Sequence, residues 1–149
     1  MTLREKLEED IKTSMRNKDQ ARLDALRFFK NAVLAVEKEQ KKGLDDVGVI
    51  DVATKQASDR RDSIKAFEEG GRDVMAAKEA AELVVLEEFL PPQMSTDQLT
   101  EIIKATAAEV GATSIQDKGK LMGKLMPQVR GKSDGTVVNE MATAYLNSL

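Results

Sequence analysis

Two consecutive prolines, Pro91 and Pro92, divide a chain whose apolar residues otherwise recur at helical spacing. Neither proline has a backbone N–H to donate, and a residue that precedes proline is pushed out of the helical region, so no helix continues through this point. No segment alternates apolar and polar residues for long enough to form a strand. The sequence therefore predicts an all-α protein, with an N-terminal helical domain at 1–90, a proline-rich connector at 91–94 and a C-terminal helical domain at 95–149.

Four helices are predicted in the N-terminal domain. The first two begin at capping residues, Thr2 with Glu5 in a capping box and Asp19 alone. The third is expected at 51–69, with 47–49 as loop or helix start, and the fourth at 73–89. Apolar residues recur at three- and four-residue spacing in these segments. The apolar stripe expected of the fourth helix consists of Val74, Ala77, Ala81, Val84 and Val85.

A small three-helix tail is predicted after the connector. Ser95 with Gln98 forms a second capping box, Ser114 or Asp117 begins the next helix, and Asp134 caps the last one. With only about 55 residues, this part would be marginally stable alone.

Composition excludes several kinds of chemistry. The chain has 149 residues with no cysteine and no histidine. Disulfides, zinc sites of the usual Cys/His kind and histidine-based acid–base catalysis are therefore excluded. We expect no catalytic residues, no metal and no cofactor. No apolar run approaches the ~20 residues of a membrane helix and no signal peptide precedes the charged start, so a cytoplasmic location is predicted.

Positive charge is concentrated in the segment 117–132, where five bases face one acid, Asp117. Lysine and arginine side chains are the usual partners of nucleic-acid phosphates, although lysines four residues apart are also common on any solvated helix face. No aromatic residue lies between Ala112 and Val138, so bases cannot stack there and contact would involve shape and backbone. The candidate nucleic-acid-binding residues are Lys118, Lys120, Lys124, Arg130 and Lys132.

Glycines and methionines make a second pattern in the same segment. Gly119 and Gly123 stand four residues apart in a predicted helix, where each costs roughly 1 kcal/mol relative to alanine. Their missing Cβ atoms predict a close approach by another helix or by a ligand. Met122 is expected in the core together with Met126. Past this helix, the motif residues Gly131, Asp134 and Gly135 predict a helix stop, an N-cap and a turn.

This segment resembles the signature of the YqeY family and is similar to the C-terminal tail of the GatB subunit of glutamine-dependent tRNA amidotransferase. The resemblance covers nearly the whole chain for YqeY and mainly the tail for GatB. It rests on Gly119, Met122-Gly123-Lys124, Met126, Gly131, Asp134-Gly135 and Val138-Asn139-Glu140, and upstream on Arg60-Arg61-Asp62-Ser63, Phe67, Phe89-Leu90-Pro91 and Met94-Ser95. The resemblance implies a relation to carbon–nitrogen ligases that use glutamine as amide donor, with tRNA and amidotransferase subunits as partners.

The residues themselves provide neither a cysteine nucleophile nor a glycine-rich nucleotide loop for amide transfer. The leading hypothesis is therefore a non-catalytic tRNA- or partner-binding module. One alternative is a helical protein–protein adaptor with no nucleic-acid role, and another is an accessory that acts only when bound to catalytic subunits. We expect no DNA or membrane partner.

A weaker candidate interaction cluster is formed by Arg60, Arg61, Asp62 and Ser63. Asp59 and Asp62 are placed to pair with the two arginines, which would make the cluster a surface salt-bridge network of little energetic weight. The alternative is an anchor for the tail or for a partner.

Overall fold

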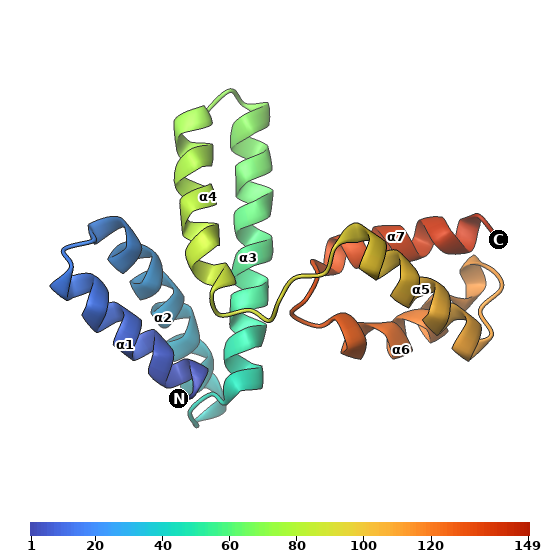
Figure 1. Cartoon of the computed structure of the whole chain (residues 1–149), viewed down its shortest axis with the longest axis horizontal. Helices are drawn as coiled ribbons and strands as arrows, with labels where there is room; N and C mark the ends of the chain where they lie inside the picture. The colour runs from blue at the N-terminus through green and yellow to red at the C-terminus, as the bar shows by residue number, and fades with distance from the viewer. The chain divides into compact units, whose positions relative to one another are not determined.

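A computed structural model describes residues 1–149 as seven α-helices and one short 3₁₀ helix, without a strand (Figure 1). The all-α prediction is confirmed. Backbone contacts gather into two compact units, Met1–Pro91 and Pro92–Leu149. Residues 92–94 thus belong to the second unit, where Met94 N donates to Lys132 O at 2.8 Å. That the two parts behave as independent domains stays a prediction.

The first unit consists of two helical hairpins, α1 (Leu3–Arg16) with α2 (Gln20–Gln40) and α3 (Asp46–Glu69) with α4 (Asp73–Glu87). The capping box of Thr2 and Glu5 is present, and Asp19 caps α2 by accepting from Arg22 N. The predicted start of the third helix at residue 51 was too late. Asp45 caps α3 by accepting from Gly48 N at 2.9 Å.

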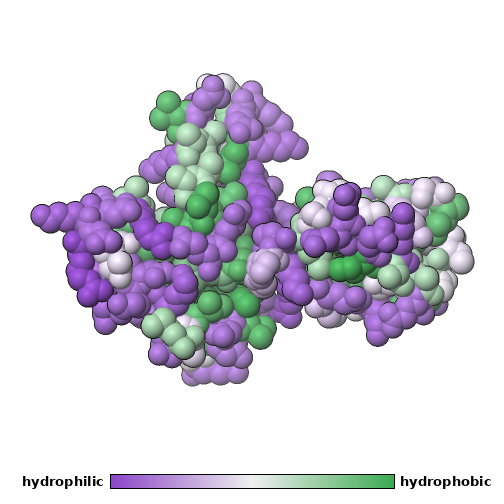
Figure 2. All heavy atoms as spheres, in the orientation of Figure 1, coloured by the Kyte–Doolittle hydropathy of each residue, from purple (hydrophilic) through white to green (hydrophobic).

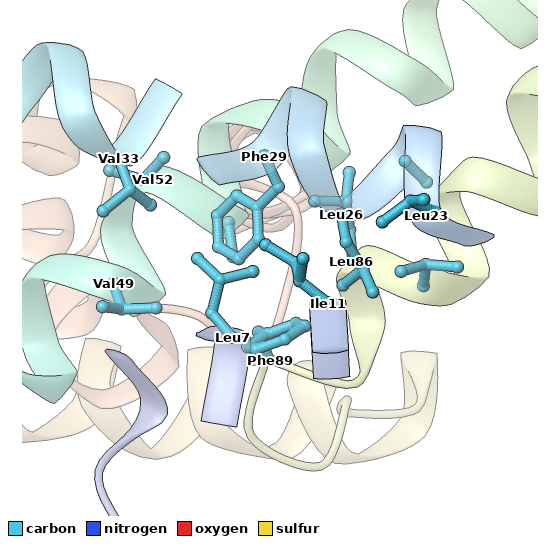
Figure 3. Packing of buried hydrophobic residues seen from close by; sticks show 13 residues of the cluster. Leu7, Ile11, Leu23, Leu26, Phe29, Val33, Val49, Val52, Leu86 and Phe89 are labelled. Atoms are coloured by element: carbon cyan, nitrogen blue, oxygen red, sulfur yellow. The ribbon is translucent and has the colours of Figure 1, made fainter. Parts of the chain in front are cut away.

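The core of this unit is built around two phenylalanines (Figure 3). Phe29 of α2 and Phe89, which follows α4, are each 1% exposed and pack edge to face with ring centroids 5.1 Å apart. Leu7 and Ile11 of α1 belong to the same cluster. Phe89 therefore ties the end of the second hairpin to the first.

The stripe predicted for the fourth helix lies mostly on its outer side. Val74 and Val84 are 85% and 62% exposed, and of the predicted stripe only Val85 is buried, together with Ala76 and Leu86. The other members were misplaced because apolar and charged residues are both spread around α4, so spacing alone could not identify the face that packs on α3.

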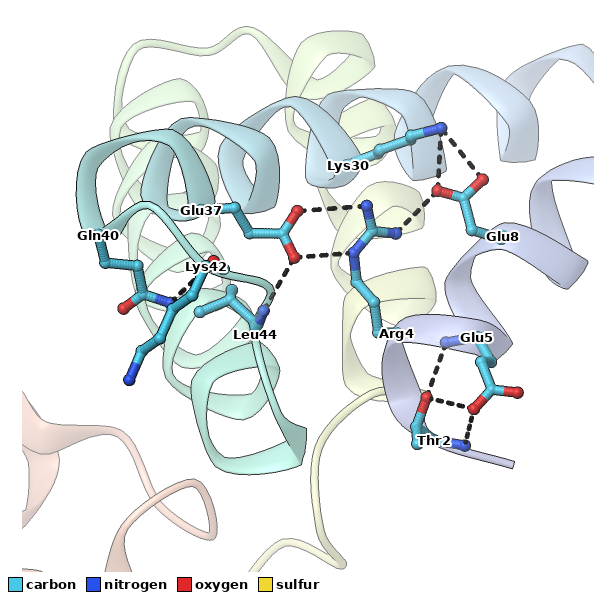
Figure 4. Close-up of polar contacts among 9 residues, drawn as sticks. All are labelled: Thr2, Arg4, Glu5, Glu8, Lys30, Glu37, Gln40, Lys42 and Leu44. Atoms are coloured by element: carbon cyan, nitrogen blue, oxygen red, sulfur yellow. Dashed lines mark hydrogen bonds and ion pairs between the residues drawn. The ribbon is translucent and has the colours of Figure 1, made fainter.

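Polar contacts join α1 to α2 along one edge (Figure 4). Arg4 Nη1 lies 2.7 Å from Glu8 Oε1, and Arg4 Nε lies 3.2 Å from Glu37 Oε2. Lys30 Nζ lies 2.9 Å from Glu8, and Glu37 also accepts from Leu44 N at 2.9 Å. Hydrogen bonds from Arg4 lower the pKa of both Glu8 and Glu37, aided by Lys30 at the first and by the Leu44 N–H at the second.

These lowered pKa values predict a loss of stability in acid. A carboxylate whose pKa is lower in the folded state stabilises the fold above its unfolded pKa of about 4.3, and this contribution disappears as the pH falls through the folded pKa. Glu37→Gln should lower the free energy of unfolding by about 1 kcal/mol at pH 7. Urea unfolding at pH 7 and below pH 4 checks this result. The variant should lose less stability than wild type on acidification, and equal losses would contradict the assignment.

The second unit contains α5 (Thr96–Val110), a 3₁₀ turn (Ile115–Asp117), α6 (Lys118–Val129) and α7 (Gly135–Asn147). Its core is formed by one apolar side of each α-helix and includes Leu99, Ile103, Leu121, Leu125, Val138 and Leu146. The predicted capping box of Ser95 and Gln98 is present. No helix in the protein is both long and apolar enough to cross a membrane.

Candidate nucleic-acid interface

Helix α6 divides into an inner and an outer side. Leu121, Leu125 and Val129 are fully buried, and Met122 and Met126 pack half-buried against the same core, as predicted. The helix begins after a 3₁₀ turn capped by Ser114, whose hydroxyl accepts from Gln116 N. The packing of the inner side of α6 determines which of its residues are exposed to solvent.

The two glycines of α6 lie on its outer side. Gly119 and Gly123 are exposed, and a Cβ atom built on either would meet nothing within 4 Å. No other helix of this unit occupies the room that the missing side chains leave. A close approach within the unit is therefore not the reason for these glycines.

Pro127 continues the outer side one turn beyond Gly123. In an α-helix the carbonyl of residue 123 would accept from the N–H of residue 127, which proline lacks. The Gly123 carbonyl is therefore left without its usual intrahelical donor. Together with the glycines, this makes the outer side of α6 a stretch of accessible backbone.

Two of the five basic candidates flank this backbone. Lys120 and Lys124 are exposed and stand one turn apart on the same side of α6. Lys124 Nζ lies 3.4 Å from Glu109 Oε1 of α5, with both side chains more than half exposed, so solvent and salt weaken that pair. Both lysines can therefore turn toward a ligand.

The other three candidates lie elsewhere. Lys118 is half-buried and about 200° around the helix from Lys120. Arg130 is the exposed C-cap of α6. Lys132 lines a separate hollow of about 640 Å³ together with the acidic Asp97 and Glu101 of α5. The structure thus brings together Lys120 and Lys124, and not all five.

Asp117, the one acid counted in this segment, lies next to the lysine pair. Asp117 accepts from Thr113 N at 2.8 Å and from Ser114 N at 3.3 Å. Mainly the bond from Thr113 N lowers the pKa of Asp117, with a smaller contribution from the positive charge of Lys120. Asp117 is therefore ionised at neutral pH beside the first lysine of the pair.

The second half of the motif is structural. Gly131 is buried with φ of +77°, and its carbonyl accepts from Gln93 Nε2 at 2.8 Å. Asp134 caps α7 by accepting from Thr136 N at 2.8 Å, with Gly135 as the first helical residue. The predicted helix stop and N-cap are confirmed.

These positions predict opposite effects of the same substitution. Gly119→Ala and Gly123→Ala should each raise the free energy of unfolding by up to about 1 kcal/mol, because alanine favours helix and meets no obstacle. Gly131→Ala should lower it by about 1–2 kcal/mol, since φ is positive there. Thermal and urea unfolding of the three variants measure these shifts. A destabilised Gly123→Ala variant would show that the helix depends on that glycine.

The Arg60–Ser63 cluster is placed differently from the prediction. Arg60 lies 3.0 Å from Glu79 and 3.3 Å from Glu82, both on α4, and its guanidinium stacks 4.4 Å from the ring centroid of Phe28. Its side chain is only 14% exposed. Asp59, which was expected to be able to pair with these arginines, lies 3.5 Å from Lys55.

Arg60 is therefore a partly buried residue whose contacts join α2, α3 and α4 in the first unit. Arg61 lies 3.8 Å from Glu87, whereas Asp62 is exposed and Ser63 half-buried. The spacing of Glu79 and Glu82, three residues apart in a predicted helix, was the signal that sequence reasoning missed. These two glutamates could be recognised as partners of an arginine on the neighbouring helix only after the structure showed that the two helices form a hairpin.

Comparisons with known proteins identify one family and several relatives. The family model described as "Yqey-like protein" matches residues 4–146. The chain is 31% identical over 147 residues to "Altered inheritance of mitochondria protein 41, mitochondrial" of Kluyveromyces lactis, covering 93% of this chain and 80% of that protein. It is 27% identical over 150 residues to the Saccharomyces cerevisiae protein of the same name, covering 96% and 78%. These names place the relatives in mitochondria, so a cytoplasmic location stays a prediction for this chain.

Proposed function

The chain belongs to the YqeY family, and from that premise we propose that it is a non-catalytic module that binds RNA, tRNA in the first place, through the outer side of α6. The observation that carries this proposal is the pair of exposed glycines, Gly119 and Gly123. Each weakens the helix by roughly 1 kcal/mol relative to alanine, and neither makes room for another part of its own unit. A partner that approaches the backbone of α6 closely explains why glycine occupies these two positions.

Charge favours a phosphate-bearing partner. Lys120 and Lys124 stand beside the glycines, where lysine side chains can reach phosphates while the backbone lies against the sugar chain. Arg130 is exposed at the end of the same helix. Lys118 and Lys132 contribute at longer range, because one is half-buried and the other lies near Asp97 and Glu101.

The backbone favours RNA over DNA. The Gly123 carbonyl lacks its helical donor because residue 127 is proline, and a ribose 2′-hydroxyl is a donor that DNA does not offer. No aromatic side chain lies between 112 and 138 to stack on bases. Contact through phosphates and riboses therefore predicts recognition of RNA shape rather than of sequence.

The chain has no cysteine to serve as the nucleophile of amide transfer. The resemblance to the GatB tail supports a role beside a glutamine-dependent tRNA amidotransferase, in which the catalytic subunits perform the chemistry and this module holds tRNA.

Fluorescence anisotropy with labelled tRNA in about 50 mM salt tests the proposal, because phosphate contacts are strong at low ionic strength. We expect saturable binding to tRNA and weaker binding to a DNA hairpin of the same sequence as one tRNA arm. Absence of tRNA binding at low salt would reject the proposal. Equal affinity for RNA and DNA would reject the contact to the 2′-hydroxyl alone.

One observation favours a second candidate, the protein–protein adaptor. The outer side of α4 exposes apolar residues, Val74 and Val84 above all, and contiguous apolar surface commonly marks protein contacts. Both functions can coexist, because the two surfaces belong to different units. Tandem pull-down from cells, with and without ribonuclease, separates partners held by RNA from partners held directly.

A further inference from the structure

Helix α4 presents an apolar stripe that no part of its own unit covers. The stripe consists of Val74, Ala77, Ala81 and Val84, all exposed, with the two valines 85% and 62% exposed. Their spacing of three, four and three residues places them on one side of the helix. Apolar atoms run down the α4 side of the hairpin in Figure 2. Toward α2, a hollow of about 340 Å³ separates Ala81 from Ala21 and Ala25.

The hairpin that carries the stripe is incomplete as a bundle. Helix α3 buries Val49, Val52, Ala53 and Ala57, which all lie in its first half. The distal part of the hairpin extends beyond α1 and α2 (Figure 1) and has only two helices, whereas a helical bundle core is usually closed by further helices. Valine also has a lower helix propensity than alanine and contributes no packing where it is exposed. A further helix from outside this unit, packed against the stripe, explains both the two-helix end of the hairpin and the exposed valines.

The order of residues identifies that partner. The stripe reads valine, alanine, alanine, valine in either direction, with the same spacings. When two such helices run antiparallel, Val74 meets Val84 of the second copy and Ala77 meets Ala81 of the second copy. The small central residues let the helices approach closely, and the larger ones fill the ends. We propose that α4 is the interface of a twofold-symmetric, antiparallel dimer of this chain.

Charges beside the stripe fit the same arrangement. Lys78 and Glu82 lie on one flank of α4, one turn apart. A twofold axis across antiparallel helices keeps each flank on its own side, so Lys78 lies about two residues, or 3 Å along the helix, from Glu82 of the second copy. One oxygen of Glu82 lies 3.3 Å from Arg60 Nε, and a carboxylate has a second oxygen to accept from lysine. Two reciprocal ion pairs result.

Cysteine cross-linking tests this register directly, because the chain has no cysteine of its own. Ala77→Cys and Ala81→Cys chains, one of them enlarged by a tag, are mixed and oxidised. A disulfide needs Cβ atoms about 3.8 Å apart. In the mixed pair the two cysteines oppose each other, whereas two copies of Ala77→Cys place them about 6 Å apart along the helices. We expect the mixed dimer to form at least about fivefold faster.

Two controls make the result decisive. Ala105→Cys, an exposed alanine of α5, should cross-link no faster than random collision. Lys78→Glu places like charges side by side and should raise the dimer Kd about tenfold in sedimentation equilibrium between about 10 and 500 μM, with an unchanged circular dichroism spectrum. A chain that stays monomeric throughout this range would overturn the proposal. Cross-linking of Ala105→Cys as fast as that of the mixed pair would overturn it too.

Discussion

Reversing the charge of both lysines on the outer side of α6, as Lys120→Glu with Lys124→Glu, is expected to lower tRNA affinity about a hundredfold at 50 mM salt. Each phosphate contact releases close to one counterion, so the loss of two contacts removes about two powers of ten at this ionic strength. The log–log dependence of affinity on salt should flatten by about 1.4–1.8 for the same reason. Anisotropy titrations at several salt concentrations measure both quantities.

Lys12 and Lys38 provide a matched control for this variant. Both are exposed lysines of the first unit, on α1 and α2. Reversing them changes the net charge of the protein equally but leaves α6 intact, so their effect should be limited to long-range attraction. An equal loss of affinity in the control would show that overall charge, and not the α6 surface, governs binding.

Phe89→Ala is expected to lower the free energy of unfolding of the first unit by about 3–5 kcal/mol, which is typical of a fully buried phenylalanine. Phe89 packs on Phe29 at 5.1 Å and lies under Lys6, whose Nζ is 4.2 Å from the ring centroid. Urea unfolding followed by circular dichroism measures the change. Because typical domains are stable by only about 5–15 kcal/mol, the variant should be close to unfolding at 37 °C.

Phe28→Ala is the corresponding control on a neighbouring residue of α2. Phe28 is 52% exposed and contacts the Arg60 guanidinium with one face. Its loss removes one cation–π contact, worth about 0.5–1 kcal/mol at an exposed site. Comparable losses in the two variants would contradict the assignment of Phe89 to the core.

Local sequence signals predicted the helix ends well. Each residue predicted to cap a helix does so, namely Thr2, Asp19, Ser95 and Asp134. These caps were predictable because capping depends on residues only two or three positions away in the sequence. The start of α3 was placed too late, at residue 51 with 47–49 left as loop or helix start, although Asp45 follows the same rule. Gly48 within its first turn made that segment resemble a loop.

Structural features that depend on residues far apart in the sequence could not be predicted from local patterns. The inner face of α4 is determined by α3, and Arg60 finds Glu79 and Glu82 only because the hairpin brings them together. The basic residues of segment 117–132 form a cluster in sequence. In space, the turn at Gly131 carries Lys132 to a hollow beside α5, away from Lys120 and Lys124.

The most direct test of the central claim is the tRNA affinity of the Gly119→Ala, Gly123→Ala double variant, measured beside its stability. Two methyl groups change no charge and meet no atom of the protein within 4 Å. If RNA lies against the backbone of α6, the variant should be more stable than wild type by up to about 2 kcal/mol and yet bind tRNA about tenfold more weakly, because the added groups hold the RNA away. A variant that gains stability and binds tRNA as tightly as wild type would contradict the account.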